Sequence, residues 1–353
     1  MQKDLIIVGQ GAAGTFLSWY LLQQGLDILV IDKIDPRSAS YSAAGMINPV
    51  TGRRIVKSWM IDEIMPFAFE AYTNIGNELG ITAIRQKNII NFFPNQQMHD
   101  VFAERVEEHA DYLVSISNDD QYKEYFNYDF GYGETAPGFL VSTHPLFASW
   151  RQQLNHKGLL LDEHFEMDAL NANDAGVSYK DFTAPKIVFC DGVHGARNPW
   201  FLNLPFASNK GQALLVEIPG LPTEKVYKRS MKLVPLGNDL FWAGASYEWD
   251  HTHEQPTEEY RKATLQSLEQ WLKLPVKLKD HVASMRPATL ERRPFAGFHP
   301  AMKSIGILNG LGTKGFSLAP YFAHQLAENI VQRKPIHPLA DVARFEKTLS
   351  RKV

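Results

Sequence analysis

The chain has 353 residues, with 36 lysine and arginine against 39 aspartate and glutamate residues, which gives a formal net charge of −3. Hydrophobic residues make up 44% and charged residues 21%, a composition that is ordinary for a globular enzyme and excludes disordered, collagen-like and coiled-coil classes. The charge gives no global attraction to nucleic acid or to an anionic membrane, although it leaves room for a local basic patch. The length suits one large domain or two closely joined domains.

Cysteine usage and hydropathy bear on the compartment. Cys190 is the only cysteine, so neither an intrachain disulfide nor a thiolate metal cluster can form, and we expect this thiol to be inert core. No apolar run approaches the roughly 18 residues needed to cross a bilayer. The first predicted strand begins at Asp4, which leaves no room for a cleavable signal peptide. We therefore expect a soluble, cytoplasmic protein. We expect no metal site, because the histidines show no metal-ligand spacing.

The N-terminal segment has the pattern of a strand that passes through a glycine turn into a helix. An apolar strand is predicted over 4–8 and an amphipathic helix over 15–24, and Gly9, Gly11 and Gly14 of a G-x-G-x-x-G motif lie between them. In such a turn the first glycine allows the tight bend, the second lets the backbone approach a pyrophosphate, and the third lets the helix pack closely on the strand. This order predicts a dinucleotide-binding site. The alternative is a plain strand-turn-helix that binds no ligand.

The next segments extend the dinucleotide pattern. A second buried strand is predicted over 27–31 and ends in Asp32, where a carboxylate would bind a ribose hydroxyl. The segment 38–49 consists mainly of small residues, with Met46 close to Gly45. Small side chains would let the backbone pass close to a flat apolar ligand, and a flexible surface loop is the alternative. The kind of dinucleotide stays open at this point.

The rest of the chain alternates between helices and short strands. We expect helices over 62–80, 100–112, 144–154, 258–272 and from 317 to 330, and strands or strand-and-turn segments over 84–93, 125–132, 159–161, 186–190, 212–217, 232–235, 240–245 and 305–309. The strand over 186–190 leads into Asp191 and Gly192, and that over 305–309 leads into a second glycine-rich turn. Open α/β sheets bind ligands at the carboxyl ends of such strands, and helix N-termini there favour anions.

Several short motifs follow one another in a fixed order along nearly the whole chain. They are Gly9, Gly11 and Gly14 with Asp32, then 42–46, 190–192, 211–212, 244–246, 285–289, Pro294 with Gly297, 310–315, and Ala319 with Pro320. In this order the chain resembles the D-amino-acid oxidase and glycine oxidase superfamily of flavoproteins. The segments 244–247 and 310–315 look closest to the C-terminal oxidoreductase module of the bifunctional tRNA wobble-uridine modification enzyme. We expect that enzyme's methyltransferase to be absent, since the flavin domain begins at residue 4.

The resemblance implies a fold and a cofactor. The fold is α/β, a Rossmann-like FAD-binding domain made of 1–83, 135–205 and 294–353, interleaved with an α+β substrate domain made of 84–134 and 206–293, whose antiparallel sheet covers the substrate. Family members with covalent flavin use a cysteine near the Arg-Pro segment, which this chain lacks, so FAD is expected to be non-covalent. The implied cofactor contacts are Gly9, Gly11, Ala12, Ala13, Gly14, Asp32, Lys33, Ser40, Ala44, Gly45, Met46, Asp191, Gly192, Gly312, Thr313, Lys314, Gly315 and Phe316.

Three basic residues are the implied catalytic candidates. By resemblance Arg286 binds the substrate carboxylate, since a guanidinium can hold a carboxylate with two hydrogen bonds; a structural salt bridge is the alternative. Lys314, at a predicted helix start, would stabilise negative charge at the flavin pyrimidine edge, unless it is an exposed turn lysine. Lys232 replaces a tyrosine of several simple amino-acid oxidases and, if it points inward, suggests a second acidic or polar substrate group. Arg53, Arg54, Lys57, Arg292 and Arg293 would line an anion entrance or form a solvated basic face.

These features together predict an FAD-dependent amine or amino-acid oxidase or dehydrogenase. Hydride transfer from the C–N bond to the flavin would leave an imine that water hydrolyses, and oxygen or another acceptor would take the electrons. The substrate would be a small amine or an amino-acid-like carboxylate. The alternatives are a stand-alone tRNA wobble-uridine-modifying FAD oxidoreductase, a non-catalytic flavin-binding subunit of a partner complex, and an NAD-dependent dehydrogenase. The low net charge makes nucleic acid an unexpected partner, although tRNA stays open.

Overall fold

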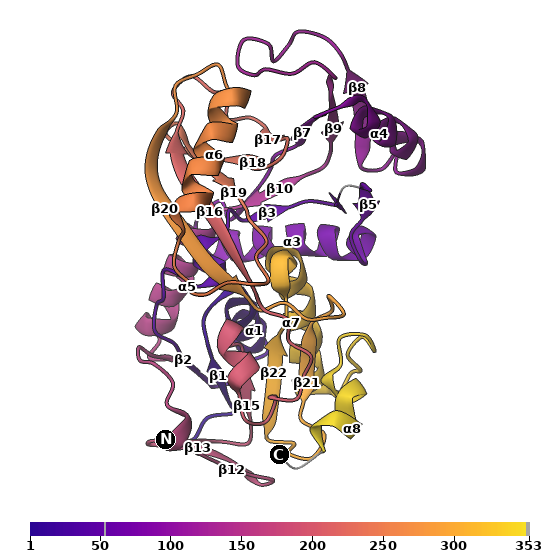
Figure 1. Ribbon diagram of the computed structural model, residues 1–353. Helices are drawn as coiled ribbons and strands as arrows, with labels where there is room; N and C mark the ends of the chain where they lie inside the picture. The colour runs from indigo at the N-terminus through magenta and orange to yellow at the C-terminus, as the bar shows by residue number, and fades with distance from the viewer. Residues whose placement is uncertain (53, 351–353) are drawn as a thin grey trace.

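The strand that precedes the first glycine turn, β1 (Leu5–Val8), is buried along its whole length and lies inside a six-stranded sheet (Figure 1). The computed structural model describes residues 1–52 and 54–350. The strand order is β11-β2-β1-β15-β22-β21, with β2 (Ile28–Ile31), β11 (Leu160–Leu161), β15 (Ile187–Phe189), β22 (Ile305–Asn309) and β21 (Phe295–Phe298). All pairs are parallel except β21 with β22. The carboxyl ends of β1, β2, β15 and β22 therefore meet at one edge.

Helices cover one face of this sheet. The first, α1 (Ala12–Gln23), packs against α7 (Gly315–Gln332), which also contacts α3 (Ile61–Leu79). A further helix, α5 (Thr143–His156), follows β10 (Phe139–Val141) and contacts both α1 and α3. The prediction that α1 is amphipathic is wrong, because every residue from 12 to 21 is buried. A helix enclosed between a sheet and other helices is apolar all round.

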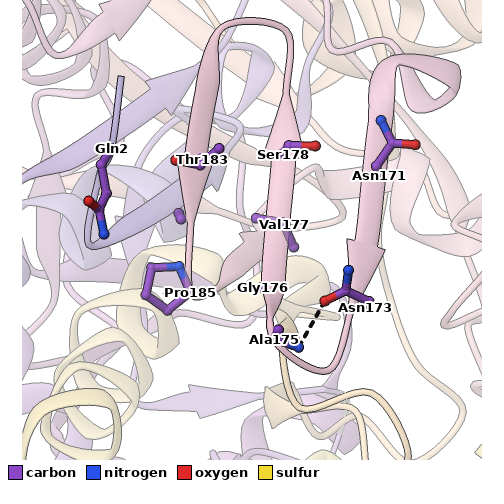
Figure 2. Close-up of a pocket in the computed structure, with 10 residues that line it drawn as sticks. Gln2, Asn171, Asn173, Ala175, Gly176, Val177, Ser178, Thr183 and Pro185 are labelled. Atoms are coloured by element: carbon purple, nitrogen blue, oxygen red, sulfur yellow. Dashed lines mark hydrogen bonds between the residues drawn. The ribbon is translucent and has the colours of Figure 1, made fainter.

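A small antiparallel sheet lies on the other face. It consists of β12 (Leu170–Asn173), β13 (Gly176–Tyr179) and β14 (Phe182–Ala184), and its buried side chains share one core cluster with those of β1 and β2. A hollow of about 350 Å³ lies beside this sheet, where Thr183 pairs with Gln2. Figure 2 shows the residues that line it. Since Gln2 precedes β1, this hollow is at the amino ends of the parallel strands.

An eight-stranded sheet forms the second large layer, drawn above the first in Figure 1. Its order is β20 (Lys277–Arg286), β16 (Asn209–Glu217), β19 (Leu240–Gly244), β18 (Lys232–Gly237), β17 (Val226–Lys228), β7 (Ile89–Phe92), β9 (Tyr132–Thr135) and β8 (Leu113–Ser117). It is antiparallel, as expected, except that β7 and β17 run parallel. One face packs under α6 (Glu258–Trp271) in an aromatic cluster around Phe126 and Tyr227. The other, termed the inner face, carries Val226 and Val234 and packs on Ala44.

Short elements connect the two large sheets. They are α2 (Ala39–Ser42), β4 (Val50–Thr51) with β5 (Val56–Lys57), and a three-stranded sheet of β3 (Met46–Ile47), β10 (Phe139–Val141) and β6 (Ile84–Gln86). The chain ends in α8 (Glu346–Leu349) within the described residues. In the part of the chain that the structure describes, no helix is both long and apolar enough to cross a membrane.

In two predicted segments the difference from the observed structure has a clear physical cause. The charged helix expected over 100–112 is α4 (Gln96–Glu108), because Asn95 caps it with its side chain, which accepts from the amide of Met98. The aromatic segment expected over 125–132 contains turns up to residue 130, and only its last residue belongs to a strand. Phe126 in this segment packs against Trp271 and Tyr227, so its aromatic residues fill a core instead of forming a ladder.

Candidate active site

The first glycine turn has the close contacts that only glycine permits. Gly9 has a φ of +98°, and a Cβ there would lie 2.5 Å from the carbonyl oxygen of Cys190. A Cβ on Gly14 would lie 1.8 Å from the carbonyl oxygen of Gly9, so α1 touches the turn backbone directly. Gly11 is the N-cap of α1, and a Cβ on it would meet only Ser40 Oγ at 2.9 Å. The N–H groups of a helix start in this position suit a pyrophosphate.

The amides at this helix start are partly engaged by side chains. The amide of Ala12 donates to Ser40 Oγ at 3.1 Å, so Ser40, expected to contact the cofactor, lies beside the turn. Ala13 is buried within α1. The amide of Gln10 donates to Asp32 Oδ1 at 2.8 Å. Asp32 therefore stands at the end of β2 next to the turn, as the pattern of the dinucleotide fold requires.

A buried arginine that the sequence did not predict also holds Asp32. Arg151 of α5 is 8% exposed, and its Nη1 donates to Asp32 Oδ2 at 2.5 Å. Its Nη2 lies 2.9 Å from Asp162 Oδ1, and the exposed Lys33 also pairs with Asp162, at 3.2 Å. A carboxylate has about four acceptor positions, so Asp32 keeps capacity for a ribose hydroxyl. Lys33, which was expected to contact the cofactor, forms a surface ion pair with Asp162.

The small-residue segment lies where the two large sheets meet, which contradicts the alternative of a flexible surface loop. Gly45 has a φ of +79°, and a Cβ on it would lie 2.4 Å from the carbonyl oxygen of Val141. Ala44 and Met46 pack against the inner face of the eight-stranded sheet. Trp242 of that sheet donates from Nε1 to the carbonyl oxygen of Ser42 at 3.0 Å. Backbone and small side chains thus form this part of the junction.

The ends of β15 and β22 are joined by Asn309, a residue not singled out in the sequence. Asn309 Nδ2 donates to Asp191 Oδ1 at 2.9 Å and to the carbonyl oxygen of Gly192 at 2.8 Å. Gly192 has a φ of +57°. Burial raises the pKa of Asp191 to about 7. Asp191 and Gly192 therefore lie at the same sheet edge as the first glycine turn, as predicted for a parallel strand.

The second glycine turn packs against the Arg-Pro segment. The amide of Gly312 donates to the carbonyl oxygen of Pro287 at 3.0 Å. Gly315 begins α7, Phe316 is buried and Thr313 is exposed. Lys314 is partly buried, and burial, followed by the charges of Arg293 and Arg292, lowers its pKa. A fully solvated turn lysine is thus excluded, although no contact in the structure assigns Lys314 a catalytic role.

Arg286 is held so that only one of its amino groups is used. Its Nη1 donates to Asn209 Oδ1 at 2.9 Å and to the carbonyl oxygen of Ser246 at 3.0 Å. Among the described residues no carboxylate forms an ion pair with it, which argues against a structural salt bridge. Its guanidinium lies 4.7 Å from the centre of the Tyr247 ring, and a Cβ on Gly211 would lie 1.8 Å from Nη2. Burial lowers the pKa of this guanidinium.

Lys232 and the remaining basic candidates fall in different places. Lys232 is on the inner face of the eight-stranded sheet, in register with Gly244. Lys57 pairs with Asp62 at 3.1 Å and with Asp111 at 3.4 Å, so its charge is offset. Arg54 and Arg292 are exposed, Arg293 lies 4.2 Å from the centre of the Trp59 ring, and Arg53 lies outside the described residues.

Comparison with known families decides the class of protein. The family described as "DAO: FAD dependent oxidoreductase" matches residues 4–329. The chain belongs to this family. It is therefore an FAD-dependent oxidoreductase, and the family leaves the nicotinamide-dependent and non-catalytic alternatives without support. The narrower resemblance to the tRNA-modifying enzyme is not confirmed and stays a prediction.

Solved structures of other flavoproteins share the fold of this DAO-family chain. Glycine oxidase from Geobacillus kaustophilus aligns with a TM-score of 0.79 at 16% identity, covering 100% of this chain and 99% of that one. Iminodiacetate oxidase from Chelativorans sp. BNC1 aligns with a TM-score of 0.75 at 20% identity, covering 95% and 96%. L-proline dehydrogenase from P. horikoshii aligns with a TM-score of 0.77 at 14% identity, covering 98% of each chain. At these identities the likeness establishes the fold.

The arrangement of this DAO-family site fits a bound FAD. A Cβ on Gly11 would meet only the Ser40 side chain, so a phosphate can approach the backbone of the helix start there. The turn at Gly312 packs against Pro287 and the segment at Gly45 packs against Val141, and α7, which follows that turn, contacts β3, which follows Gly45. The hollow in Figure 2 is at the other edge of the six-stranded sheet. It therefore takes no part in this site.

Proposed function

We propose that the protein oxidises the C–N bond of an amino-acid-like amine and that Arg286 binds the substrate carboxylate. The observation that supports this most strongly is the open donor edge of Arg286. Both hydrogens of Nη1 have acceptors in Asn209 and Ser246, whereas Nε and Nη2 have no protein acceptor among the described residues. A guanidinium edge with two free N–H groups matches a carboxylate, which accepts two parallel hydrogen bonds.

The surrounding residues position the substrate. Asn209 and the Ser246 carbonyl fix the plane of the guanidinium, so a carboxylate on the free edge would take one orientation. That orientation would direct the amine toward the junction near Gly312, because the Pro287 carbonyl holds this turn against the Arg-Pro segment. FAD, when bound, supplies the hydride acceptor for the C–N bond. Lys314, at the start of α7, would place positive charge near that acceptor. Water then hydrolyses the imine product.

Replacement of Arg286 tests this assignment. Arg286→Met should raise the dissociation constant of carboxylate substrates and inhibitors on the order of a hundredfold, since charge-assisted hydrogen bonds are worth about 1.5–3 kcal/mol. Arg286→Lys should recover only part of the affinity, because an ammonium cannot offer the planar pair of donors. Titration of the FAD-loaded protein with a carboxylate inhibitor, followed through the flavin absorbance, measures both variants.

The matched control is Arg261→Met. Arg261 lies on α6, partly exposed and paired with Glu258 at 2.6 Å, so its loss should leave the dissociation constant within about twofold. An Arg286→Met protein that binds carboxylates as tightly as the wild type would contradict the proposed role.

An alternative function has one structural observation in its favour. Tyr247, which contacts Arg286, is 60% exposed, and Trp249 is 57% exposed. Exposed aromatic faces stack on unpaired bases, so a carboxymethyl group on a tRNA wobble uridine stays an alternative substrate. Mass analysis of tRNA nucleosides from a deletion strain tests it, and unchanged wobble modifications would count against it.

The attachment of FAD is also a proposal. Cys190, the only cysteine, is buried, and burial raises the pKa of its thiol well above the usual value, which disfavours a nucleophilic thiolate. We therefore propose non-covalent FAD. Acid precipitation should release all of the flavin into the supernatant, whereas flavin that stays with the pellet would indicate a covalent link.

A further inference from the structure

Two lysines face each other on the inner face of the eight-stranded sheet. Lys228 of β17 and Lys232 of β18 are direct partners in the antiparallel register. The neighbouring pair, Tyr227 with Leu233, is buried in the core under α6. Because side chains alternate between the two faces of a strand, both lysines lie on the inner face. Like charges directly opposite each other in a sheet are destabilising.

Neither lysine has an anionic partner among the residues that the structure describes. Burial lowers the pKa of Lys228, and burial, followed by the charges of Lys228 and Arg286, lowers the pKa of Lys232 to about 8. The nearby Lys225 behaves differently, because its Nζ lies 2.6 Å from Glu134 Oε1. A fold that places two cations together in a partly buried position without a carboxylate keeps an unfavourable arrangement. A bound anion would relieve it.

The lysine pair and Arg286 lie on the same face of the sheet, with β19 between them. Gly244 of β19 is in register with Lys232 on one side and with Ala213 of β16 on the other. The Arg286 guanidinium overlies Gly211 of β16. Since β16 and β18 are both neighbours of β19, the two cationic ends are about 10 Å apart before the side chains lean toward each other. Beside Gly244 lies the ring of Trp242, since a Cβ on Gly244 would be 2.9 Å from Trp242 Cη2. A ligand that spans the two cationic ends would therefore contact this ring.

We infer that Lys228 and Lys232 bind a second carboxylate of the substrate, so that the enzyme acts on a dicarboxylic amine held at both ends. Arg286 holds the first carboxylate, which is the part of the inference that rests on the proposed function. The amine then lies between the two anionic ends, beside the Trp242 ring. A substrate with one carboxylate would leave the ammonium groups of the lysine pair unpaired, and it would bind more weakly.

The test uses ligands that cannot be oxidised, so it does not depend on turnover. Glutarate and its mono-amide, glutaramate, have nearly the same shape and differ by one charge. In calorimetric titration of the FAD-loaded wild type, the dissociation constant of glutarate should be lower than that of glutaramate, on the order of tenfold. Lys228→Met and Lys232→Met should each reduce this preference to about twofold or less. Both variants should fold, because each removes an unpaired cation and keeps the apolar stem.

A control variant and the binding preferences of the two ligands show which results would overturn the inference. Lys279→Met removes an exposed lysine of β20 that pairs with Glu217 at 2.7 Å, and it should keep the wild-type preference. Equal binding of the two ligands by the wild type, or a preference that survives in both variants of the lysine pair, would overturn the inference. If neutral amino acids bleach the flavin but glutarate shows no preference, the proposed function stands and the second carboxylate site fails. If glutarate is preferred but no amine bleaches the flavin, the anion site stands and the proposed function fails.

Discussion

The Asp191 carboxyl gives the site a residue-scale dependence on pH. Its pKa is raised from 3.8 to about 7, mainly by burial, so the folded protein keeps a proton that the unfolded chain has lost. Between about pH 4 and pH 7 the unfolded state binds fewer protons than the folded state. The contribution of Asp191 to the free energy of unfolding therefore decreases as pH rises through this window, by up to about 4 kcal/mol, and stays low above pH 7.

Asp191→Asn isolates this effect. Asparagine keeps an oxygen that can accept from Asn309 Nδ2, which lies 2.9 Å from Asp191 Oδ1, but it cannot ionise. The free energy of unfolding of the variant minus that of the wild type should rise from about pH 4 to pH 7 and then level off. Urea unfolding of both proteins at several pH values measures the difference. A difference independent of pH would show that folding does not raise the pKa of Asp191.

At the scale of one element, the glycines at the start of α1 have separable roles. Gly14→Ala should destabilise the fold by about 3 kcal/mol or more, because its Cβ would lie 1.8 Å from the Gly9 carbonyl oxygen and backbone must move. Gly11→Ala should change the free energy of unfolding by less than about 1 kcal/mol, since its Cβ meets only the Ser40 hydroxyl. It should instead weaken FAD binding on the order of tenfold, because the methyl group occupies the approach to the pyrophosphate.

Unfolding of the two apoproteins in urea and fluorescence titration with FAD measure these effects. Gly11→Ala is the matched control for Gly14→Ala, since both add one methyl group at the same helix end. Equal loss of stability in the two variants would contradict the separation of roles.

The same element shows what the sequence could and could not predict. The tasks of Gly9, Gly11 and Gly14 were predictable because they arise within one turn and its adjoining strand and helix. Arg151 was not, because its bond to Asp32 joins residues 119 apart in sequence. Asn309 was missed for the same reason, since its contact with Asp191 spans 118 residues. Pairing of distant segments depends on tertiary packing, which no local pattern encodes.

The two lysines of the eight-stranded sheet show a similar limit of prediction from sequence. Lys232 was identified by its departure from a family motif, but its partner Lys228 was not. The pairing of these two lysines depends on the register of β17 and β18, and a shift by one residue would have placed one of them on the opposite face. Burial of α1 on all sides was also missed, because its environment is set by α5 and α7, far along the chain.

At the scale of the whole molecule, the two large sheets meet through contacts from separate parts of the chain. Trp242 of the eight-stranded sheet donates to the Ser42 carbonyl beside Gly45, and the Gly312 amide donates to the Pro287 carbonyl that follows Arg286. The proposed substrate position at this junction therefore needs both sheets. The fold class and the flavin family were predictable from the ordered motifs, whereas the substrate depends on which side chains the eight-stranded sheet presents on its inner face.

The most direct test of the central claim is anaerobic mixing of the FAD-loaded protein with a panel of amines. The panel contains D- and L-amino acids, including dicarboxylic ones, and N-carboxymethyl amines, each beside the hydroxy acid of the same skeleton. Our account predicts that at least one amine with a carboxylate bleaches the long-wavelength flavin band, with one equivalent of carbonyl product per flavin, and that its hydroxy acid does not. Bleaching by hydroxy acids alone, or by no compound while dithionite still bleaches the band, would contradict the account.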